Sequence, residues 1–174
     1  MKSNKNLVFL GMMGSGKSSI GNLVSKKLNR KFIDIDILIE TEAKMNISNI
    51  FKEKGEDYFR SLEEKITLKN LKTTDTVVSL GGGAFINEKI RKEILANNFS
   101  FWLSWSDAIL LKRIKSSKKR PLALNSTDHE IKNLIKKRSK IYLKAHFKIN
   151  CNKCTKTEIV KKIIKIYENN SIKS

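Results

Sequence analysis

A glycine-rich loop near the start of the chain is the strongest chemical signal in the sequence. Residues 11–18, G-M-M-G-S-G-K-S, fit the pattern G-x-x-x-x-G-K-[ST] between a predicted strand and a predicted helix. Glycines let backbone N–H groups surround phosphate oxygens, and the helix N-terminus adds partial positive charge. In this pattern Lys17 reaches the β- and γ-phosphates and the Ser18 hydroxyl ligates Mg²⁺. The loop therefore predicts a nucleoside triphosphate site. Its predicted contacts are Gly14, Ser15, Gly16, Lys17, Ser18 and Ser19.

Two aspartates end the second predicted strand. Open parallel sheets bind ligands at this edge, and strand alternation would point Asp34 and Asp36 in the same general direction. One carboxylate can then hold a Mg²⁺-bound water while the other accepts a proton from a hydroxyl group. Taken alone, such aspartates are just as often helix caps.

An arginine–glutamate pair and a run of glycines follow. Arg60 and Glu63 are three residues apart on a predicted helix, so they can pair and hold the guanidinium still for a carboxylate ligand. Alone, such a pair is more often a functionally silent surface ion pair. The run Gly81-Gly82-Gly83 comes directly after the third predicted strand. Because three glycines carry a large conformational-entropy cost, their usual reason is close approach of the backbone to a ligand.

These residues need an alternating chain of strands and helices to bring them together. Short apolar runs predict strands at 7–10, 32–36, 77–80, 100–104 and 147–149. Helices are expected at 19–28, 37–45, 48–54, 57–71, 88–97, 107–115, 128–145 and 156–168, the last two opened by capping boxes at Thr127/Glu130 and Thr155/Glu158. The pattern predicts an α/β fold, a five-stranded parallel sheet with helices on both faces, in one domain over 1–174.

Composition narrows the function classes. The chain has 174 residues, of which 40% are hydrophobic, so it can bury a core and is not a disordered basic tail. No apolar run reaches membrane-spanning length. The net charge of +19 suggests nucleic acid or an acidic membrane, but the lysines scatter around the predicted helices and Trp102 and Trp105 lie in or beside a strand expected to be buried. We therefore expect no nucleic-acid or membrane partner. The apolar stretch at the start, residues 7–13, is too short for a signal peptide, and no long exposed apolar face calls for a partner, so we expect a cytoplasmic monomer.

The ordered motifs resemble the shikimate kinase family over nearly the whole chain. In order they are the phosphate loop, Asp34-x-Asp36, Phe59-Arg60-x-x-Glu63, Gly81-Gly82-Gly83, Arg120-Pro121-Leu122 and Arg138-x-x-x-Tyr142. The phosphate loop occurs in many folds, whereas the ordered set of the other five is specific. The resemblance implies ATP- and Mg²⁺-dependent phosphorylation of shikimate at its 3-hydroxyl, a step of aromatic amino acid biosynthesis. It also implies a P-loop kinase architecture of the nucleoside monophosphate kinase type, with a substrate-binding region over about 34–63 and a mobile lid over about 116–127.

The resemblance further implies roles on the acceptor side. Asp36 would bind shikimate hydroxyls and act as the base for the attacking one, while Asp34 would orient Mg²⁺ through water. Arg60 and Arg138 would clamp the shikimate carboxylate. Gly82 would contact a substrate hydroxyl through its backbone. The remaining predicted contacts to the acceptor are Phe51, Phe59, Gly81 and Gly83.

On the nucleotide side, the resemblance makes Arg120 the lid arginine that neutralises charge on the transferring phosphoryl group. Arg113 would stack on adenine. The family's adenine loop usually carries an arginine and a proline, but residues 150–156 here contain neither. Lys153 keeps the positive charge there without the planar guanidinium, so the shape of this edge of the adenine pocket departs from the family pattern.

Cys151 and Cys154 form a C-x-x-C in the same loop. A zinc site would need two more ligands, and a thioredoxin-like role would place the motif at an early strand–helix junction. We assign these cysteines no role from the sequence.

Two alternative functions remain. A gluconate or nucleoside monophosphate kinase would share the phosphate loop and architecture, but such kinases lack the glycine run paired with Phe59-Arg60-x-x-Glu63. A nucleic-acid-binding NTPase would explain the net charge, and it predicts aromatic and basic residues interleaved on one exposed face.

Overall fold

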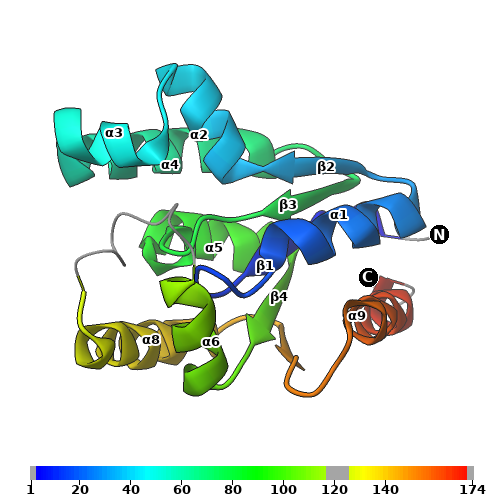
Figure 1. Cartoon of the computed structure of the whole chain (residues 1–174). Coiled ribbons are helices and arrows are strands. Elements are labelled where there is room, and N and C mark those ends of the chain that lie inside the picture. The colour runs from blue at the N-terminus through cyan, green and yellow to red at the C-terminus, as the bar shows by residue number, and fades with distance from the viewer. Residues whose placement is uncertain (1–2, 117–125, 172–174) are drawn as a thin grey trace.

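The chain alternates strands and helices around one sheet in the computed structural model, which describes residues 3–116 and 126–171 (Figure 1). The strands are β1 (Leu7–Leu10), β2 (Lys31–Asp34), β3 (Thr76–Ser79), β4 (Phe99–Ser104) and β5 (Phe147–Asn150). The helices are α1 (Lys17–Leu28), α2 (Ile35–Ala43), α3 (Ile47–Glu53), α4 (Gly55–Leu71), α5 (Glu88–Asn97), α6 (Asp107–Lys115), α8 (Asp128–Tyr142) and α9 (Lys156–Ser171), with a 3-10 turn, η1, at Ala84–Ile86.

The sheet is parallel and has the order β2-β3-β1-β4-β5, which confirms the predicted five-stranded parallel sheet. β1 is central, and its Phe9 lies between Ser79 of β3 and Phe101 of β4. The carboxyl ends of all five strands therefore meet at one edge. The phosphate loop, Asp34 and the glycine run all begin at that edge.

Helices cover both faces of the sheet, as predicted (Figure 1). Successive residues of the fully buried β1 alternate between two apolar clusters because strand side chains alternate faces. Leu7 and Phe9 pack with residues of α1 and α9. Val8 and Leu10 pack with residues of the other helices, among them α4, α5 and α8. This two-sided burial explains why the strand is a continuous apolar run.

The boundary between β2 and α2 differs from the prediction. The strand ends at Asp34, not at Asp36, because the Asp34 carboxylate accepts a hydrogen bond from the backbone N–H of Asp36 at 3.1 Å and caps α2. Asp36 lies in the first helical turn. The expectation that strand alternation would orient both carboxylates was therefore wrong, and the helix-cap alternative holds for Asp34.

Helix starts elsewhere follow the local sequence. Thr127 and Glu130 form the predicted capping box at α8. The Thr155 hydroxyl and the Glu158 carboxylate form the same reciprocal bonds at α9. α1 begins at Lys17, two residues before the predicted start, with Gly16 at its N-cap.

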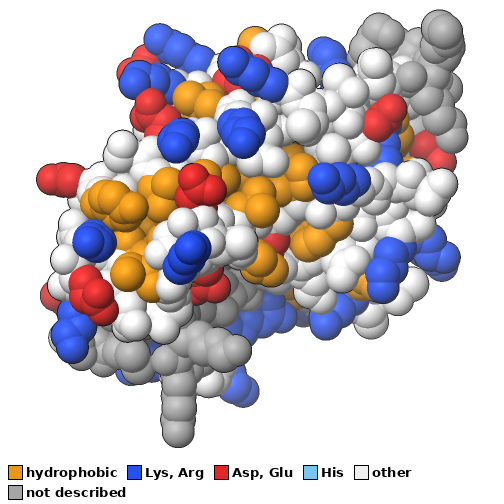
Figure 2. Space-filling view, turned by 90° about the horizontal axis from the view of Figure 1, so that it is seen from above, with side chains coloured by type: hydrophobic (Ala, Val, Ile, Leu, Met, Phe, Trp, Pro, Cys, Tyr) orange, Lys and Arg blue, Asp and Glu red, His pale blue; other side chains and the backbone are white. Residues whose placement is uncertain are grey.

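The face over α2, α3 and α4 shows how the surface charge is distributed (Figure 2). Hydrophobic side chains gather across this face. The exposed large hydrophobic residues include Ile37 of α2 and Tyr58 of α4. Lys and Arg side chains stand apart there, separated by acidic and uncharged groups.

Within the described part of the chain, no helix is both long enough and apolar enough to cross a bilayer.

Candidate active site

The phosphate loop connects the end of β1 to the start of α1. Gly14 (φ 79°) and Gly16 (φ 90°) adopt left-handed conformations that non-glycine residues rarely take. Gly11 lies so close to β4 that an added Cβ would be 3.0 Å from the Leu103 carbonyl oxygen. The glycines are therefore needed for the backbone path itself.

Two polar side chains of this loop, those of Lys17 and Ser15, are buried. Lys17 is 8% exposed, and its ammonium donates to the carbonyls of Gly11 at 3.0 Å and Met12 at 3.1 Å. The Ser15 hydroxyl is buried without a hydrogen-bond partner among the described residues. An ammonium and a free hydroxyl at a helix N-terminus fit a phosphate group.

A tryptophan that the sequence analysis did not assign to the site supports the loop. Trp105 donates its indole N–H to the Ser15 carbonyl at 2.9 Å. The Arg113 guanidinium lies 3.8 Å from the Trp105 ring centre and donates to the Gly14 carbonyl at 3.4 Å. The structure thus places Arg113 beside the phosphate loop. The sequence did offer one signal for Trp105: it is an aromatic N–H donor directly after β4, at the edge of the sheet where ligands bind.

Oxygen donors suited to Mg²⁺ lie next to the loop. The hydroxyls of Ser18 and Ser79 are 3.4 Å apart, and the Asp34 carboxylate is 9% exposed at the end of β2. Among residues 3–116 and 126–171, no group of three or more His, Cys, Asp or Glu side chains could form a metal cage. Mg²⁺ in kinases is typically held by one or two protein oxygens, water and the nucleotide phosphates, so this donor set fits.

Two carboxylates converge beside Gly81. A Cβ at Gly81 would lie 2.5 Å from Oε1 of Glu63 and 2.7 Å from Oδ1 of Asp36. Burial raises the pKa of Asp36 to about 6, and the positive charge of Lys17 opposes that rise. This electrostatic interaction joins the phosphate loop to the acceptor side. The raised pKa, which burial causes, suits a general base.

Arg60 is held by two glutamates on its own helix, α4. Its Nη1 donates to Glu63 Oε2 at 2.7 Å, and its Nε and Nη2 donate to Glu56 Oε1 at 3.1 Å. Glu63 is 2% exposed, and burial raises its pKa while Arg60 opposes that rise. The predicted Arg60–Glu63 pair is therefore present and half-buried, unlike a surface ion pair.

Aromatic rings flank the Arg60 guanidinium. The centres of the Phe51 and Phe59 rings are 4.6 Å apart, and the guanidinium lies 5.0 Å from the Phe59 ring centre. These rings supply an apolar wall next to a cation. Such a wall suits a carboxylate attached to a carbon ring.

Arg138 and Tyr142, one turn apart on α8, meet the middle glycine. A Cβ at Gly82 would lie 3.5 Å from Nη1 of Arg138. The buried Tyr142 hydroxyl donates to the Gly82 carbonyl, and burial raises the pKa of Tyr142 to about 12, so it remains a donor. The sequence placed Tyr142 in a motif without giving it a role; here it fixes the backbone of the glycine run.

Each glycine of the run therefore makes room for a different neighbour. Gly81 adjoins the Asp36 and Glu63 carboxylates, and a Cβ at Gly83 would lie 2.5 Å from Nη1 of Arg60. At Gly82 the tight neighbour is the phosphate loop, because a Cβ there would lie 3.2 Å from the backbone N of Met13. None of the three has a positive φ, so space, and not backbone conformation, requires glycine here.

The sequence and the fold both match known proteins. The sequence model of the shikimate kinase family matches residues 13–168. The chain belongs to the shikimate kinase family. A shikimate kinase of Sulfurihydrogenibium sp. (strain YO3AOP1) is 41% identical over 160 residues, covering 92% of this chain and 96% of that relative.

Solved structures agree with the family assignment. A shikimate kinase from Acinetobacter baumannii in complex with shikimate superposes with a TM-score of 0.91 at 27% identity, covering 97% of this chain and 96% of that one. A shikimate kinase from Aquifex aeolicus superposes with a TM-score of 0.86 at 36% identity, covering 97% and 99%. The predicted family and P-loop fold are thereby confirmed.

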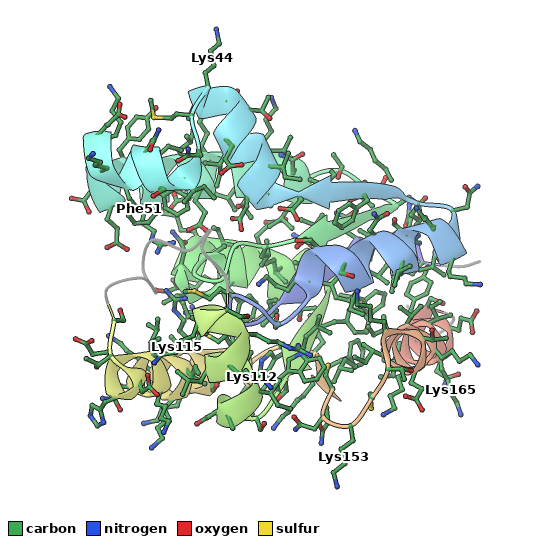
Figure 3. The ribbon with its side chains drawn as sticks, in the orientation of Figure 1. Lys44, Phe51, Lys112, Lys115, Lys153 and Lys165 are labelled. Carbon is green, nitrogen blue, oxygen red and sulfur yellow. The ribbon has the colours of Figure 1, made fainter. Side chains whose placement is uncertain are left out.

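Two predicted nucleotide-side residues of this shikimate kinase family member are not among the residues that the structure brings together in the cluster. Arg120 and most of the expected lid, residues 117–125, lie outside the described residues. Lys153 is exposed at the turn between β5 and α9, and Figure 3 shows its side chain pointing away from the ribbon.

Gly81→Ala provides a test of the crowding at the glycine run. The methyl group would collide with the Asp36 and Glu63 carboxylates, so we expect kcat/KM for the acceptor to fall at least about 100-fold, the size seen when catalytic groups are displaced by about 1 Å. Steady-state kinetics would measure the fall. Thr74→Ala, at an exposed position in the loop between α4 and β3, is the control. A Gly81→Ala enzyme with wild-type kinetics would contradict the crowding.

Proposed function

We propose that this protein transfers the γ-phosphoryl group of ATP to the 3-hydroxyl of shikimate, giving ADP and shikimate 3-phosphate. The observation that carries the proposal is the meeting of Asp36, Arg60 and Arg138 along the glycine run, beside a phosphate loop. Family membership supports the reaction class. One solved family member, from Acinetobacter baumannii, is in complex with shikimate.

Two arginines would bind the acceptor's carboxylate. Arg60 is immobilised by Glu63 and Glu56, and Arg138 approaches the same glycine run from α8. Fixed guanidinium groups bind carboxylates through paired N–H donors. Phe51 and Phe59 would cover the apolar side of the carbocycle, and the backbone of Gly82, held by Tyr142, would contact a ring hydroxyl.

Asp36 would then act as the general base. Its carboxylate accepts the proton of the attacking hydroxyl while that oxygen bonds to the γ-phosphorus and the bond from phosphorus to the β–γ bridging oxygen breaks. Lys17 stabilises charge on the transferring phosphoryl group and its leaving oxygen. Mg²⁺, held by Ser18 and through water by Asp34, would supply further charge neutralisation to the phosphates.

The remaining assignments complete the proposed site. The phosphates would contact the loop residues 14–19, with Arg120 acting from the lid. Arg113 and Lys153 would lie on the adenine side. We propose a single domain over residues 1–174, acting as a cytoplasmic monomer without a nucleic-acid partner.

An ADP-release assay across candidate acceptors tests the proposal. Shikimate should support turnover with ATP and Mg²⁺, while gluconate and nucleoside monophosphates should give background rates. Folded protein that phosphorylates gluconate or a nucleoside monophosphate, and not shikimate, would overturn the assignment. Removal of Mg²⁺ with a chelator should abolish turnover with shikimate.

Arg138→Ala tests the carboxylate clamp. Loss of a charge-assisted hydrogen bond costs about 1.5–3 kcal/mol, so the KM for shikimate should rise about 10- to 100-fold while the KM for ATP changes less than about twofold. Arg60→Ala should behave similarly. Lys140→Ala, an exposed cation on the same helix, α8, is the control. An unchanged KM for shikimate in either arginine variant would refute the clamp.

A further inference from the structure

The proposed site uses neither cysteine, yet the structure gives the C-x-x-C a specific setting. Cys151 and Cys154 are the first and last residues of the turn that connects β5 to α9. The Cys154 N–H donates to the Cys151 carbonyl at 3.2 Å, and Lys153 within the turn has a left-handed φ of 57°. Such a β-turn keeps its end Cα atoms within about 7 Å, and disulfides span about 4.4–6.8 Å. The two residues are therefore close enough to be bridged.

Cys154 is the accessible and positively surrounded thiol of the pair. It is partly exposed, and the Lys162 ammonium lies 3.1 Å from its sulfur. Donation to that sulfur raises the pKa of Lys162, so the ammonium remains charged. The Cys154 thiol also lies 3.8 Å from the Asn150 carbonyl oxygen. A neighbouring cation favours attack by a cysteine sulfur on an oxidant.

Cys151 has the opposite environment. It is fully buried, its thiol donates to the Ile149 carbonyl at 3.3 Å, and burial raises its pKa to about 12. A protonated, inaccessible thiol does not react directly with an oxidant. Its sulfur can attack a neighbouring oxidised sulfur when its proton passes to the hydroxide that leaves. The described residues hold no third ligand that would make this pair a metal site.

We propose that Cys154 and Cys151 form a hydroperoxide-responsive thiol pair that acts on the nucleotide side of the enzyme. The Cys154 thiolate attacks the terminal oxygen of the peroxide, forming Cys154–SOH and releasing hydroxide or alkoxide, which takes up a proton. The Cys151 sulfur then attacks the Cys154 sulfur, an S–S bond forms, and the S–OH bond breaks. The Cys151 proton and the departing hydroxide form water. The peroxide is reduced, and the two thiols are oxidised to one disulfide.

Hydrogen bonds connect this turn to the phosphate loop. The Cys151 N–H donates to the Ser104 carbonyl at 2.9 Å, and the Ser106 N–H donates to the Asn152 side chain at 2.9 Å. Between these two anchors lies Trp105, which donates to the Ser15 carbonyl. Closing a disulfide would alter the turn that carries Asn152 and would strain this connection. The expected effect on nucleotide binding rests on the proposed function, whereas the thiol chemistry does not.

Peptide mass spectrometry of the full-length protein after hydrogen peroxide treatment tests the thiol chemistry. Wild-type protein should lose two hydrogen atoms and yield a Cys151–Cys154 disulfide peptide. Cys151→Ser should instead form a Cys154 sulfenic acid that dimedone traps. Cys154→Ser should leave Cys151 reduced. A wild-type Cys154 that stays reduced while glutathione in the same solution is oxidised would overturn the proposal, as would oxidation of Cys151 in Cys154→Ser.

A charge-matched pair of lysine variants tests the part played by Lys162. Lys162→Met should slow Cys154 oxidation several-fold, whereas Lys165→Met should leave the rate unchanged. Lys165 is an exposed lysine on the same helix, α9 (Figure 3). Equal rates in the two variants would remove the basis for Cys154 reactivity.

Kinetics of the oxidised protein test the functional consequence. The disulfide form should show a several-fold higher KM for ATP, an unchanged KM for shikimate, and full recovery with dithiothreitol. An unchanged KM for ATP would overturn the link to the nucleotide side. Absence of shikimate turnover would contradict the proposed function, and the mass-spectrometric result would still decide the thiol chemistry.

Discussion

Asp36→Asn is expected to lower kcat about 10²- to 10⁴-fold, the usual contribution of a positioned general base. Asparagine has nearly the size of aspartate but does not accept the proton of the attacking hydroxyl. The measurement is kcat at saturating shikimate and ATP. Asp57→Asn, an exposed residue of α4 near the same region, should keep wild-type activity. An Asp36→Asn enzyme with kcat within a few-fold of wild type would eliminate Asp36 as the base.

The same carboxylate should set the acid limb of the wild-type pH profile. Burial raises the Asp36 pKa to about 6, and Lys17 opposes that rise. Since the base acts only when ionised, kcat/KM for shikimate should be level above about pH 7 and fall about tenfold per unit well below pH 6. A limb centred near the ordinary aspartate pKa of about 4 would contradict the buried environment.

Removing this charge should also stabilise the protein. The folded state holds the Asp36 proton up to about pH 6, whereas the unfolded chain releases it near the ordinary aspartate pKa of 3.8. Between these values the folded state binds more protons, so this group makes stability fall as pH rises, and its full cost is present above about pH 6. Asp36→Asn should therefore raise the free energy of unfolding by about 1–3 kcal/mol at pH 8. Thermal melts at pH 8 would show this as an increase in Tm.

Elements that depend on a local pattern of residue types could be predicted from the sequence. Strand β1 is a continuous apolar run because helices cover the sheet on both faces. The start of α8 is recognisable because Thr127 and Glu130 have the residue types and spacing of a capping box. The boundary at Asp34 was misplaced because one side chain determines it. That side chain can end a strand or cap a helix, and residue spacing does not distinguish the two.

The shape of the acceptor site depended on contacts that the sequence does not record. The motif order predicted Arg60, Arg138 and the glycine run as neighbours, and the structure brings them together. Why each glycine is needed emerges only when α2, α4 and α8 are placed around β3. Trp105 was missed for a similar reason, because its role depends on the Ser15 carbonyl, ninety residues away.

Lys17→Met should cause the other large loss of activity. Its ammonium is buried in the phosphate loop, where it donates to two backbone carbonyls and where methionine provides similar bulk without charge. Removing one preorganised electrostatic contact to the reacting group typically costs about 10²- to 10³-fold in kcat. We expect a loss of at least that size. Lys27→Met, an exposed lysine on the same helix, α1, is the control.

The residual activity of Lys17→Met carries a second, more specific prediction. Because the Lys17 charge lowers the pKa of Asp36, its removal should raise that pKa and shift the acid limb of kcat/KM to a pH above 6. Lys17→Arg keeps the charge but changes the shape, so its activity should fall while its acid limb stays near pH 6. If the limbs of both variants coincide with that of the wild-type enzyme, Lys17 and Asp36 are not electrostatically coupled. If only Lys17→Met shifts, the ammonium of the phosphate loop also tunes the base that activates the acceptor.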